Sequence, residues 1–370
     1  MQQPFNTVSM TKKILFAAGD VGGARALIPV IRTASQRGHD ALVLRHGYLA
    51  RESDAQWQWA VPTNFENTAL DSLLDITIPD VVIFASSVKD SAALSLARRA
   101  QMRGIKVLHV LDSWTAYLSR MQTDGKSALS PDIYAVMDTL AAEAAEAEGI
   151  SRGSIRITGQ PSLSDNMQSF LTASETKPRQ GGPKQILFVS EPIGDDQGSS
   201  DESPFYRGYT EPEVVQLLCR ALQPLAEHVY LSLLPHPRED EAKLADIWQK
   251  NRGALQGAVL PKSITATPLR PYDGIIGMAS ILLYEAWLIG RPTLSLQPGL
   301  QLQSLRQIGV RAGVLLVDSV EGAEAKIQDW IEMLEIDSPI VIRAEAKAHA
   351  KATQNVLSLA LELANTDTCD

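Results

Sequence analysis

The sequence predicts an α/β protein with two Rossmann-like domains that face each other across a crevice, and a helix that closes the chain. Short apolar or β-branched runs recur between longer helical patterns, which is typical of βα units on a parallel sheet. This alternation stops once and then restarts. The length of 370 residues also favours two domains, and no repeat of about 20 to 50 residues relates the two halves.

The first half alternates apolar runs that are too short for helices with longer segments of helical periodicity. Gly38, Gly104 and Gly149 follow the three helical segments, where left-handed caps end helices. We expect strands at residues 14–18, 41–45, 81–85, 107–111, 133–136 and 155–158, and helices at residues 24–37, 91–103 and 139–148. These elements complete one domain, at residues 10–170.

The periodicity disappears where Ser, Thr, Lys, Pro and Gly dominate, so we place a linker at residues 171–184. A second domain follows at residues 185–343, and residues 344–370 form a C-terminal helix and tail. We expect strands at residues 185–189, 229–234, 274–277, 293–296 and 314–317, and helices at residues 213–228, 239–251, 279–289, 302–307 and 322–335.

The composition argues against several classes of protein. A net charge of −9 and a pI near 5.3 argue against a nucleic-acid-binding protein. The richest apolar stretch is interrupted by Glu285, so no membrane span is expected, and residues 1–9 do not resemble a secretory signal. Cys219 and Cys369 suggest neither a disulfide framework nor a zinc site, and such cysteine usage fits the cytoplasm.

The loop predicted after the first strand, Ala18-Gly-Asp-Val-Gly-Gly-Ala-Arg25, is rich in glycine. Gly22 and Gly23 permit a tight turn and close approach of a ligand, and free amides at a helix start favour an anion. The spacing is G-x-x-G-G, however, and not the dinucleotide pattern G-x-G-x-x-G. The second strand also ends in Arg45-His46 where an acidic residue should meet a ribose, so we expect no nicotinamide cofactor.

His236 follows an apolar strand and lies between two prolines, in Leu233-Leu-Pro-His-Pro-Arg-Glu239. Proline fixes φ and keeps its neighbours extended, so His236 and Pro237 should form a stiff loop at the crevice. The imidazole could stabilise a leaving phosphate as a general acid or an electrostatic clamp. The alternative is a loop histidine that is hydrogen-bonded to backbone.

Residues 273–298 predict a strand, a turn of small residues, an apolar helix and another strand. Glu285 is the only charged side chain of that helix, and a buried lone carboxylate needs a partner. A phosphate at the turn would leave a ribose near Glu285, about 10 Å along the helix. The alternative is an ion pair with Arg270 or Arg291. The residues that would meet the nucleotide at the turn are Gly277, Met278, Ala279 and Ser280.

Two further strand ends carry polar candidates. Ser190 could contact the phosphate of a ligand. In the same loop, the pair Asp195-Asp196 is more typical of solvent-exposed acidic residues than of a metal site. Asp112 follows a strand of the first domain and could deprotonate the hydroxyl of a substrate that accepts a transferred group. Trp114 beside it could stack on a sugar ring on this acceptor side. His109, within that strand, is expected in the core.

The opening motif Gly19-Asp-Val-Gly-Gly-Ala-Arg resembles that of GT-B glycosyltransferases that move N-acetylglucosamine from UDP. The resemblance implies that this loop faces the reaction centre. Those enzymes often carry a His at the end of the loop, and the corresponding residue here is Ala24. Asp20 is then the nearest titratable group, and both catalysis and helix capping stay open for it.

Segments of the second domain resemble the same superfamily. Residues 273–298 are similar to the nucleotide-binding segment of GT-B transferases and UDP-N-acetylglucosamine 2-epimerases. They share its order of a small-Gly-small turn, then Glu285-Ala286, then Leu288-Ile-Gly-Arg-Pro292. His236-Pro237 resembles the motif that bacterial GT-B sialyltransferases place against the donor phosphate. Gly159-Gln-Pro161 resembles the Gly-x-Pro turn at the hinge edge of these folds, which implies a turn that lines the crevice.

Taken together, the residues and the resemblance predict a metal-independent glycosyltransferase that needs no bound cofactor. It would move a sugar from a UDP- or CMP-activated donor to a glycan or small-molecule acceptor. The alternatives are a nucleotide-sugar epimerase or hydrolase on the same fold, and a non-catalytic nucleotide-sugar binding protein. The catalytic candidates are Asp20, Asp112 and His236.

Overall fold

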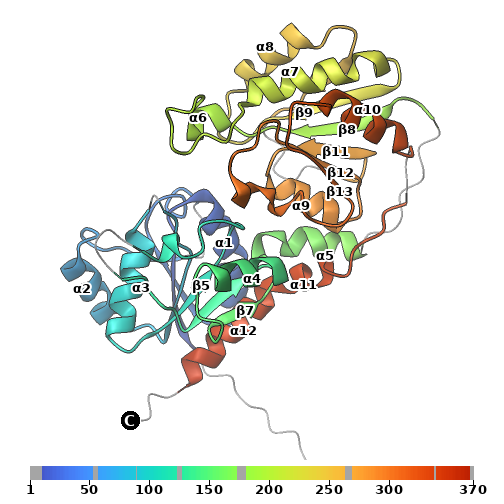
Figure 1. Cartoon of the computed structure of the whole chain (residues 1–370). Coiled ribbons are helices and arrows are strands. Elements are labelled where there is room, and N and C mark those ends of the chain that lie inside the picture. Colours follow the sequence, from blue (N-terminus) through green and yellow to red (C-terminus); the bar gives the residue numbers. More distant parts are fainter. Residues whose placement is uncertain are drawn as a thin grey trace, which may run out of the picture. The chain divides into compact units, whose positions relative to one another are not determined.

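The computed structural model describes residues 11–52, 57–88, 90–122, 127–172, 181–262, 269–336 and 339–366 (Figure 1). The chain divides into two compact units. One unit extends to Leu171 and takes in the chain again from Lys347 onward, and the other comprises Thr172–Ala346. Most of the segment expected as a linker, and also Cys369, lie outside the described residues.

The first unit is built on a parallel sheet with the strand order β3-β2-β1-β4-β5-β6-β7. The neighbours of the central strand β1 are β2 and β4, so the direction of winding reverses beside it. The strands are β1 (Lys13–Ala17), β2 (Asp40–Leu44), β3 (Gln58–Ala60), β4 (Val81–Phe84), β5 (Lys106–Val110), β6 (Ile133–Val136) and β7 (Ile155–Ile157).

Helices cover this sheet and also bring back the end of the chain (Figure 1). Leu27 and Ile31 of α1 share one buried cluster with Val356 and Leu357 of α12, so these two helices pack on the same part of the sheet. The helices of this unit are α1 (Val21–Gln36), α2 (Asn67–Thr77), α3 (Ala92–Met102), α4 (Thr139–Ala147), α5 (Ser164–Thr172), α11 (Ala346–Ala350, which begins at the unit boundary) and α12 (Ala352–Asn365).

The Gly159-Gln-Pro161 turn after β7 is covered by the returning C-terminal segment. Gln160 is 1% exposed, and its backbone N–H donates to Nδ1 of His349 at 2.9 Å. Gly159 has a φ of +84°, and a Cβ there would lie 2.7 Å from the carbonyl oxygen of Ala348. This turn therefore packs against the C-terminal segment of the first unit, and its role in lining a crevice stays a prediction.

The second unit repeats the architecture with the strand order β10-β9-β8-β11-β12-β13, again parallel, and the winding reverses between β8 and β11. Its strands are β8 (Lys184–Val189), β9 (Val229–Leu234), β10 (Gln256–Val259), β11 (Gly274–Gly277), β12 (Thr293–Leu296) and β13 (Val314–Val317). Its helices are α6 (Ile193–Gln197), α7 (Glu211–Leu222), α8 (Glu241–Asn251), α9 (Ile281–Leu288) and α10 (Ala323–Met333).

The structure differs from the expected elements in ways that affect the site. Helix α1 begins at Val21 and not at residue 24, so Gly22 and Gly23 lie in its first turn. Helix α9 begins at Ile281 because Ser280 caps it, and the helix expected at residues 302–307 is a 3-10 segment, Gln303–Gln307. Among the described strands and α-helices, the sequence pattern missed β3, α2, α5, α6 and β10.

Among the described helices, none combines the length and the apolar character that crossing a lipid bilayer requires. This finding agrees with the interruption of the richest apolar stretch by a buried carboxylate, at Glu285 in α9. The side chain of Glu285 is 3% exposed, so the helix is buried as the sequence pattern predicts.

Candidate functional site

Each unit has a place where ligands of open α/β sheets bind, at the carboxyl ends of the strands beside the reversal of winding. In the first unit this place is the turn from β1 to α1, which is flanked by the chain that leaves β2 and the chain that leaves β4. In the second unit it lies between the segment after β8 and the segment after β11. The candidate residues of each unit gather there.

Asp20 occupies the N-cap position of α1, but its side chain makes no capping hydrogen bond. Its backbone carbonyl accepts from the N–H of Ala24 at 2.9 Å, which closes the first helical turn. The carboxylate of Asp20 is exposed, and no acidic residue lies in the first turn of the helix. Of the two roles left open by the sequence, capping through the carboxylate is not observed.

Asp112 lies over the start of the same helix and is held by Arg120. Its Oδ1 accepts from Nη1 of Arg120 at 2.6 Å, and its Oδ2 lies where a Cβ on Gly22 would overlap it. The side chain of Asp112 is 15% exposed and that of Arg120 is 6% exposed. Gly22 is therefore needed to make room for this carboxylate at the helix start.

Arg120 organises the loop that follows β5. All five of its N–H groups donate: Nη1 to Asp112 and to the carbonyl of Ser86, Nη2 to Ser113 and to the carbonyl of Thr115, and Nε to the carbonyl of Ala116. The loop bends tightly to do this, since Ala116 adopts a left-handed φ of +59°. A buried guanidinium whose donors are all satisfied fixes the position of Asp112.

His109 is fully buried, as expected for a core residue, and it stacks on Tyr134 with ring centroids 4.7 Å apart. Burial, with the charge of Arg120 as a second cause, holds the pKa of His109 well below its ordinary value. The folded state therefore keeps this ring neutral at a pH where the unfolded chain already binds a proton.

The buried His109 predicts a loss of stability on acidification. Below about pH 6.5 the histidine binds a proton in the unfolded state but not in the folded state. The free energy of unfolding therefore falls by up to about 1.4 kcal/mol per pH unit. In His109→Leu this contribution should disappear, and the free energy of unfolding should fall less steeply with decreasing pH than in the wild type. Denaturant titrations from pH 7.5 to 5.5 measure the slopes. The exposed His228→Ala serves as control, and equal slopes for His109→Leu and wild type would contradict the assignment.

The ring of Trp114 is buried and hydrogen-bonded. It is 6% exposed, and its indole N–H donates to Oδ2 of Asp138 at 3.0 Å. Oδ1 of Asp138 accepts from the N–H of Ala141 and so caps α4. Trp114 thus links two loops at the carboxyl edge, and its acceptor-side role stays a prediction.

A pair that sequence reasoning missed lies over Gly19, before α1. Nε2 of His46 is 3.0 Å from both carboxylate oxygens of Asp90. A Cβ on Gly19 would overlap Asp90 and would come within 2.9 Å of the His46 ring. The only sequence signal was Gly19 itself, because a glycine in such a turn marks the close approach of another group.

In the second unit, Glu239 fixes the loop that carries His236. Glu239 is 2% exposed; its Oε1 accepts from the hydroxyl of Ser190 at 2.8 Å and its Oε2 from the backbone N–H of His236 at 3.0 Å. Burial raises the pKa of the Glu239 carboxyl, and these two hydrogen bonds oppose the rise. Ser190 is fully buried and supports the His236 loop through Glu239, and its contact with a phosphate stays a prediction.

His236 is partly exposed beside the exposed Pro237, and its tautomer follows from its neighbour. Nδ1 accepts from the backbone N–H of Arg238 at 3.2 Å. An accepting Nδ1 carries no proton, so the ring proton of the neutral imidazole lies on Nε2. The hydrogen-bond donor of the neutral ring is therefore at Nε2.

The turn from β11 to α9 is already in contact with a carboxylate. Oε2 of Glu191 accepts from the backbone N–H of Ala279 at 2.7 Å, and Oε1 lies 3.5 Å from Nη1 of Arg207. Arg207 and Glu191 are 11% and 15% exposed. The amide expected to be available to a phosphate is thus occupied by Glu191, which sequence reasoning did not identify.

The other predicted nucleotide contacts differ in accessibility. Gly277 and Met278 are buried; the carbonyl of Met278 accepts from the hydroxyl of Ser295 at 2.7 Å. Ser280 caps α9 through the N–H of Leu282, and both Ala279 and Ser280 stay partly exposed. Because α9 begins at Ile281, the helical rise to Glu285 is about 6 Å and not the 10 Å expected from the sequence.

The acidic pair Asp195-Asp196 lies in α6 and is paired with cations. Asp196 makes two hydrogen bonds to Arg238, at 2.7 and 2.6 Å, and Asp195 lies 3.2 Å from Nζ of Lys243. Lys243 also contacts the buried Glu211 at 3.1 Å. No cluster of metal-ligating side chains is found in the part of the chain that the structure describes.

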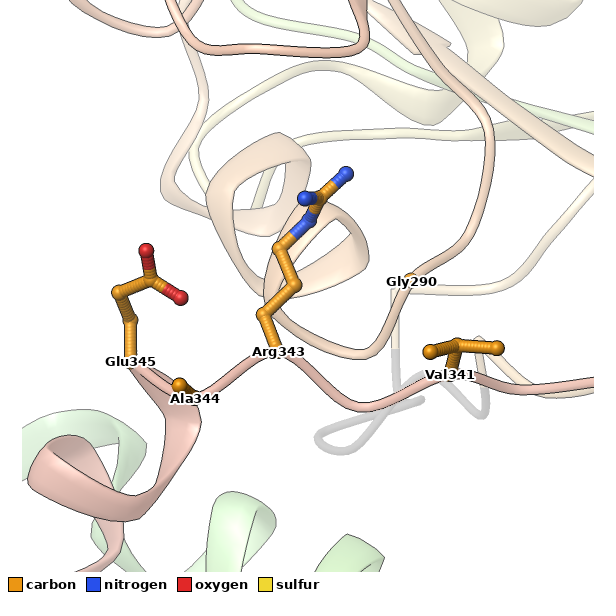
Figure 2. A pocket seen from close by; sticks show the side chains of 5 residues that line it. All are labelled: Gly290, Val341, Arg343, Ala344 and Glu345. Carbon is orange, nitrogen blue, oxygen red and sulfur yellow. The ribbon is translucent and has the colours of Figure 1, made fainter.

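A pocket of about 350 Å³ lies at the other end of α9. It is lined by Gly290, Val341, Arg343, Ala344 and Glu345 (Figure 2). Arg343 closes the helix there: its backbone N–H donates to Leu288 at 2.8 Å and its Nε donates to Trp287 at 2.9 Å. These contacts satisfy carbonyls at the helix C-terminus, where a cation is favoured. The pocket is therefore separate from the turn that contacts Glu191.

Solved structures with the same architecture include nucleotide-sugar proteins. A UDP-N-acetylglucosamine 2-epimerase of Rickettsia bellii matches with a TM-score of 0.59 and 16% identity, over 96% of this chain and 98% of that chain. MurG of Acinetobacter baumannii matches with a TM-score of 0.61 and 14% identity, over 95% and 100%. The Neisseria meningitidis UDP-GlcNAc 2-epimerase bound to UDP-GlcNAc matches with a TM-score of 0.58 and 13% identity, over 94% and 99%.

No protein-family model matches the sequence, and no curated protein matches it. At these identities, the structural matches establish the fold. The chain has a GT-B-type α/β fold with two parallel sheets and interleaved helices, as the sequence predicts.

Proposed function

We propose that this chain is an enzyme that acts on a nucleotide-activated sugar, and that it transfers the sugar to a hydroxyl acceptor. The observation that carries the proposal is the second unit's reversal point, where a capped turn leads into a helix whose only carboxylate, Glu285, is buried. Helix starts favour phosphate, and a carboxylate one turn further suits ribose hydroxyls. The structural neighbours that hold UDP or UDP-GlcNAc support this choice of ligand.

In this proposal the second unit holds the nucleotide. The partly exposed Ala279 and Ser280 meet the phosphates, and Glu285 accepts hydrogen bonds from the ribose. Nε2–H of His236 donates to the leaving diphosphate, because its tautomer is set by Arg238 and its loop by Glu239. An acceptor hydroxyl attacks C1 of the sugar, its proton passes to a base, and the C1–O bond to phosphate breaks with its electron pair on the diphosphate.

Epimerisation of the donor sugar is the second candidate function, and the 2-epimerases among the structural neighbours favour it. A hydrolase or a binding protein would use the same second unit. We propose action in the cytoplasm, which suits the free, buried thiol of Cys219.

Product analysis tests these functions directly. The protein is incubated with UDP-GlcNAc, other UDP-sugars and CMP-sugars, with and without a panel of glycan and small-molecule acceptors, and products are identified by NMR and mass spectrometry. A glycosylated acceptor with free nucleotide supports transfer. A new nucleotide sugar without acceptor supports epimerisation, and free sugar supports hydrolysis. Binding of a nucleotide sugar without any product would replace the proposal by a binding function.

Glu191 gives this proposal a specific consequence. A diphosphate that reaches the N–H of Ala279 must displace the Glu191 carboxylate, and like charges at that distance disfavour binding. Glu191→Gln should therefore bind UDP about tenfold more tightly than the wild type, or about 1.4 kcal/mol. Calorimetric titration measures the two Kd values. Asp195→Asn, which removes a carboxylate paired with Lys243, should leave Kd nearly unchanged, and an equal or weaker Kd for Glu191→Gln would contradict the phosphate position.

A further inference from the structure

Three buried side chains of the second unit form one chain of hydrogen bonds, which we call the relay. Its members are Tyr209, just before α7, Ser295, in β12, and Gln297, directly after β12. Tyr209 is 1% exposed, and the other two are fully buried. The hydroxyl of Tyr209 lies 2.8 Å from Oε1 of Gln297, and Nε2 of Gln297 lies 3.0 Å from Oγ of Ser295. The relay ends at the carbonyl oxygen of Met278, which lies 2.7 Å from Oγ of Ser295.

The relay has one consistent direction. A carbonyl oxygen only accepts, so the hydroxyl of Ser295 donates to Met278. Oγ of Ser295 then accepts from one N–H of the Gln297 amide, whose other N–H donates to the carbonyl of Leu305 at 3.0 Å. Oε1 of Gln297 is left to accept from the hydroxyl of Tyr209. Burial raises the pKa of Tyr209 well above its ordinary value, so this hydroxyl keeps its proton and donates.

The peptide unit that receives the relay joins Met278 to Ala279, in the turn from β11 to α9. In a planar trans peptide the C=O and the N–H point in opposite directions, so a carbonyl that is held on one side fixes the direction of the N–H on the other. The N–H of Ala279 donates to Oε2 of Glu191 at 2.7 Å. The relay therefore sets the direction of the N–H for which Glu191 and, in the proposed function, a phosphate compete.

Glu191 also orients this N–H, but a phosphate that takes its place removes that contact. The hydrogen bond from Ser295 to the carbonyl of Met278 stays, so the N–H of Ala279 remains directed at the ligand. A donor that is held in place before the ligand arrives avoids a cost of ordering on binding. The relay thus supplies preorganisation where the carboxylate cannot.

Tyr209 is itself held by the chain that precedes it. The carbonyl of Arg207 accepts from the N–H of Gln301 at 2.9 Å. Gly208 has a φ of +98°, and a Cβ there would lie 2.0 Å from the carbonyl oxygen of Gly299. Residues 207–209 therefore lie against the chain that follows β12, and the start of the relay has a defined position.

We propose that Tyr209, Gln297 and Ser295 are positioning residues that direct the N–H of Ala279 at the phosphate of a bound nucleotide. This inference rests on the proposed function and names the residues that prearrange its phosphate contact. Because the relay acts on this N–H, it favours a nucleotide that carries phosphate over the bare nucleoside, whose ribose is proposed to meet Glu285.

Binding is compared in the full-length Glu191→Gln chain, where no carboxylate competes with the phosphate. To this parent are added Ser295→Ala, which removes the last hydroxyl of the relay, Tyr209→Phe, which removes the first, and Ser295→Thr, which keeps a hydroxyl. The matched control is Thr293→Val, because Thr293 lies on the same face of β12 and its buried hydroxyl donates to a backbone carbonyl at 2.9 Å, two residues earlier. Calorimetry measures Kd for UDP, NMR titration measures Kd for uridine, and thermal unfolding measures Tm.

Ser295→Ala should weaken UDP binding about tenfold and leave the Kd of uridine within about twofold of the parent. Tyr209→Phe should show the same selectivity with a smaller loss, and Ser295→Thr should restore the Kd of the parent for UDP. Thr293→Val should lower Tm and change neither Kd. The proposal would be overturned by an unchanged UDP Kd in Ser295→Ala, by an equal loss for UDP and uridine, or by a loss in Thr293→Val as large as that in Ser295→Ala.

A measurement without ligand separates this inference from the proposed function. The amide of Ala279 is observed by NMR after selective ¹⁵N-alanine labelling of the full chain with Glu191 intact, and Ala279→Gly assigns its signal. The short hydrogen bond to a carboxylate moves the amide proton downfield, so Ser295→Ala should shift the signal upfield and Thr293→Val should leave it in place. An unchanged signal in Ser295→Ala would overturn the relay. The expected shift without UDP binding by any chain would contradict the proposed function, while the relay would still direct the N–H.

Discussion

Replacing Arg120 by Met should destabilise the protein by roughly 3 to 5 kcal/mol, the cost of breaking a buried ion pair by removing one partner. The guanidinium is 6% exposed and satisfies Asp112 together with the carbonyls of Ser86, Thr115 and Ala116. Methionine fills a similar volume but donates no side-chain hydrogen bond, so the Asp112 carboxylate and the carbonyls of Ser86 and Thr115 lose the donors that Arg120 supplies. Denaturant unfolding monitored by circular dichroism measures the change in the free energy of unfolding.

A matched arginine separates this effect from loss of charge in general. Arg152 is 84% exposed and lies 3.6 Å from Glu146, so Arg152→Met should change stability by less than about 1 kcal/mol. Arg120→Lys keeps the charge but cannot supply five donors in a plane, so it should lose most of the stability as well. If Arg120→Met unfolds at the same denaturant concentration as the wild type, the loop after β5 does not depend on this residue.

Replacing His236 by Ala should lower kcat by about a hundredfold or more while Tm stays nearly unchanged. The rate falls because Nε2–H is the donor proposed for the leaving diphosphate, and one such donor is commonly responsible for a factor of 10² to 10³. The fold is retained because Glu239 binds the backbone N–H of residue 236, which alanine also has. Steady-state kinetics and thermal unfolding together test this separation.

Glu239→Ala is the informative counterpart for the same loop. It removes the buried acceptor of Ser190 and of the His236 N–H, so both Tm and kcat should fall. Were His236→Ala to lose stability and activity in the same proportion as Glu239→Ala, His236 would be a structural residue of the loop.

The sequence predicts most of the strands and misses one edge strand of each sheet. β6, β9, β11, β12 and β13 coincide with the expected ranges because each is a short, mainly apolar run, as is typical of strands in a covered parallel sheet. β3 and β10 lie at sheet edges, where Gln-Trp-Ala and Gln-Gly-Ala-Val lack such a run. A helix begins later than expected where a capping side chain sets its first residue. Ser280 caps α9, which therefore begins at Ile281 and not at residue 279.

The candidate site was predictable only where one segment carries it. The loop of His236 and the helix of Glu285 are local patterns, and the structure shows both elements near the expected positions. Pairs between distant segments had no local signal: Glu191 and Ala279 are 88 residues apart, and His46 and Asp90 are 44 apart. Such pairs depend on which strands become neighbours, and apolar periodicity does not encode the strand order.

Nucleotide binding by the second unit is the central claim, and titration of the wild type and Glu285→Ala with UDP, CMP, GDP and their sugars tests it most directly. The wild type should bind one nucleotide class saturably, and Glu285→Ala should bind it more weakly by about 1.5 to 3 kcal/mol, through loss of charge-assisted hydrogen bonds to the ribose. Glu332→Ala, at an exposed carboxylate in α10, should bind like the wild type. No binding of any nucleotide by the folded wild type, or equal affinity in a folded Glu285→Ala, would contradict the account.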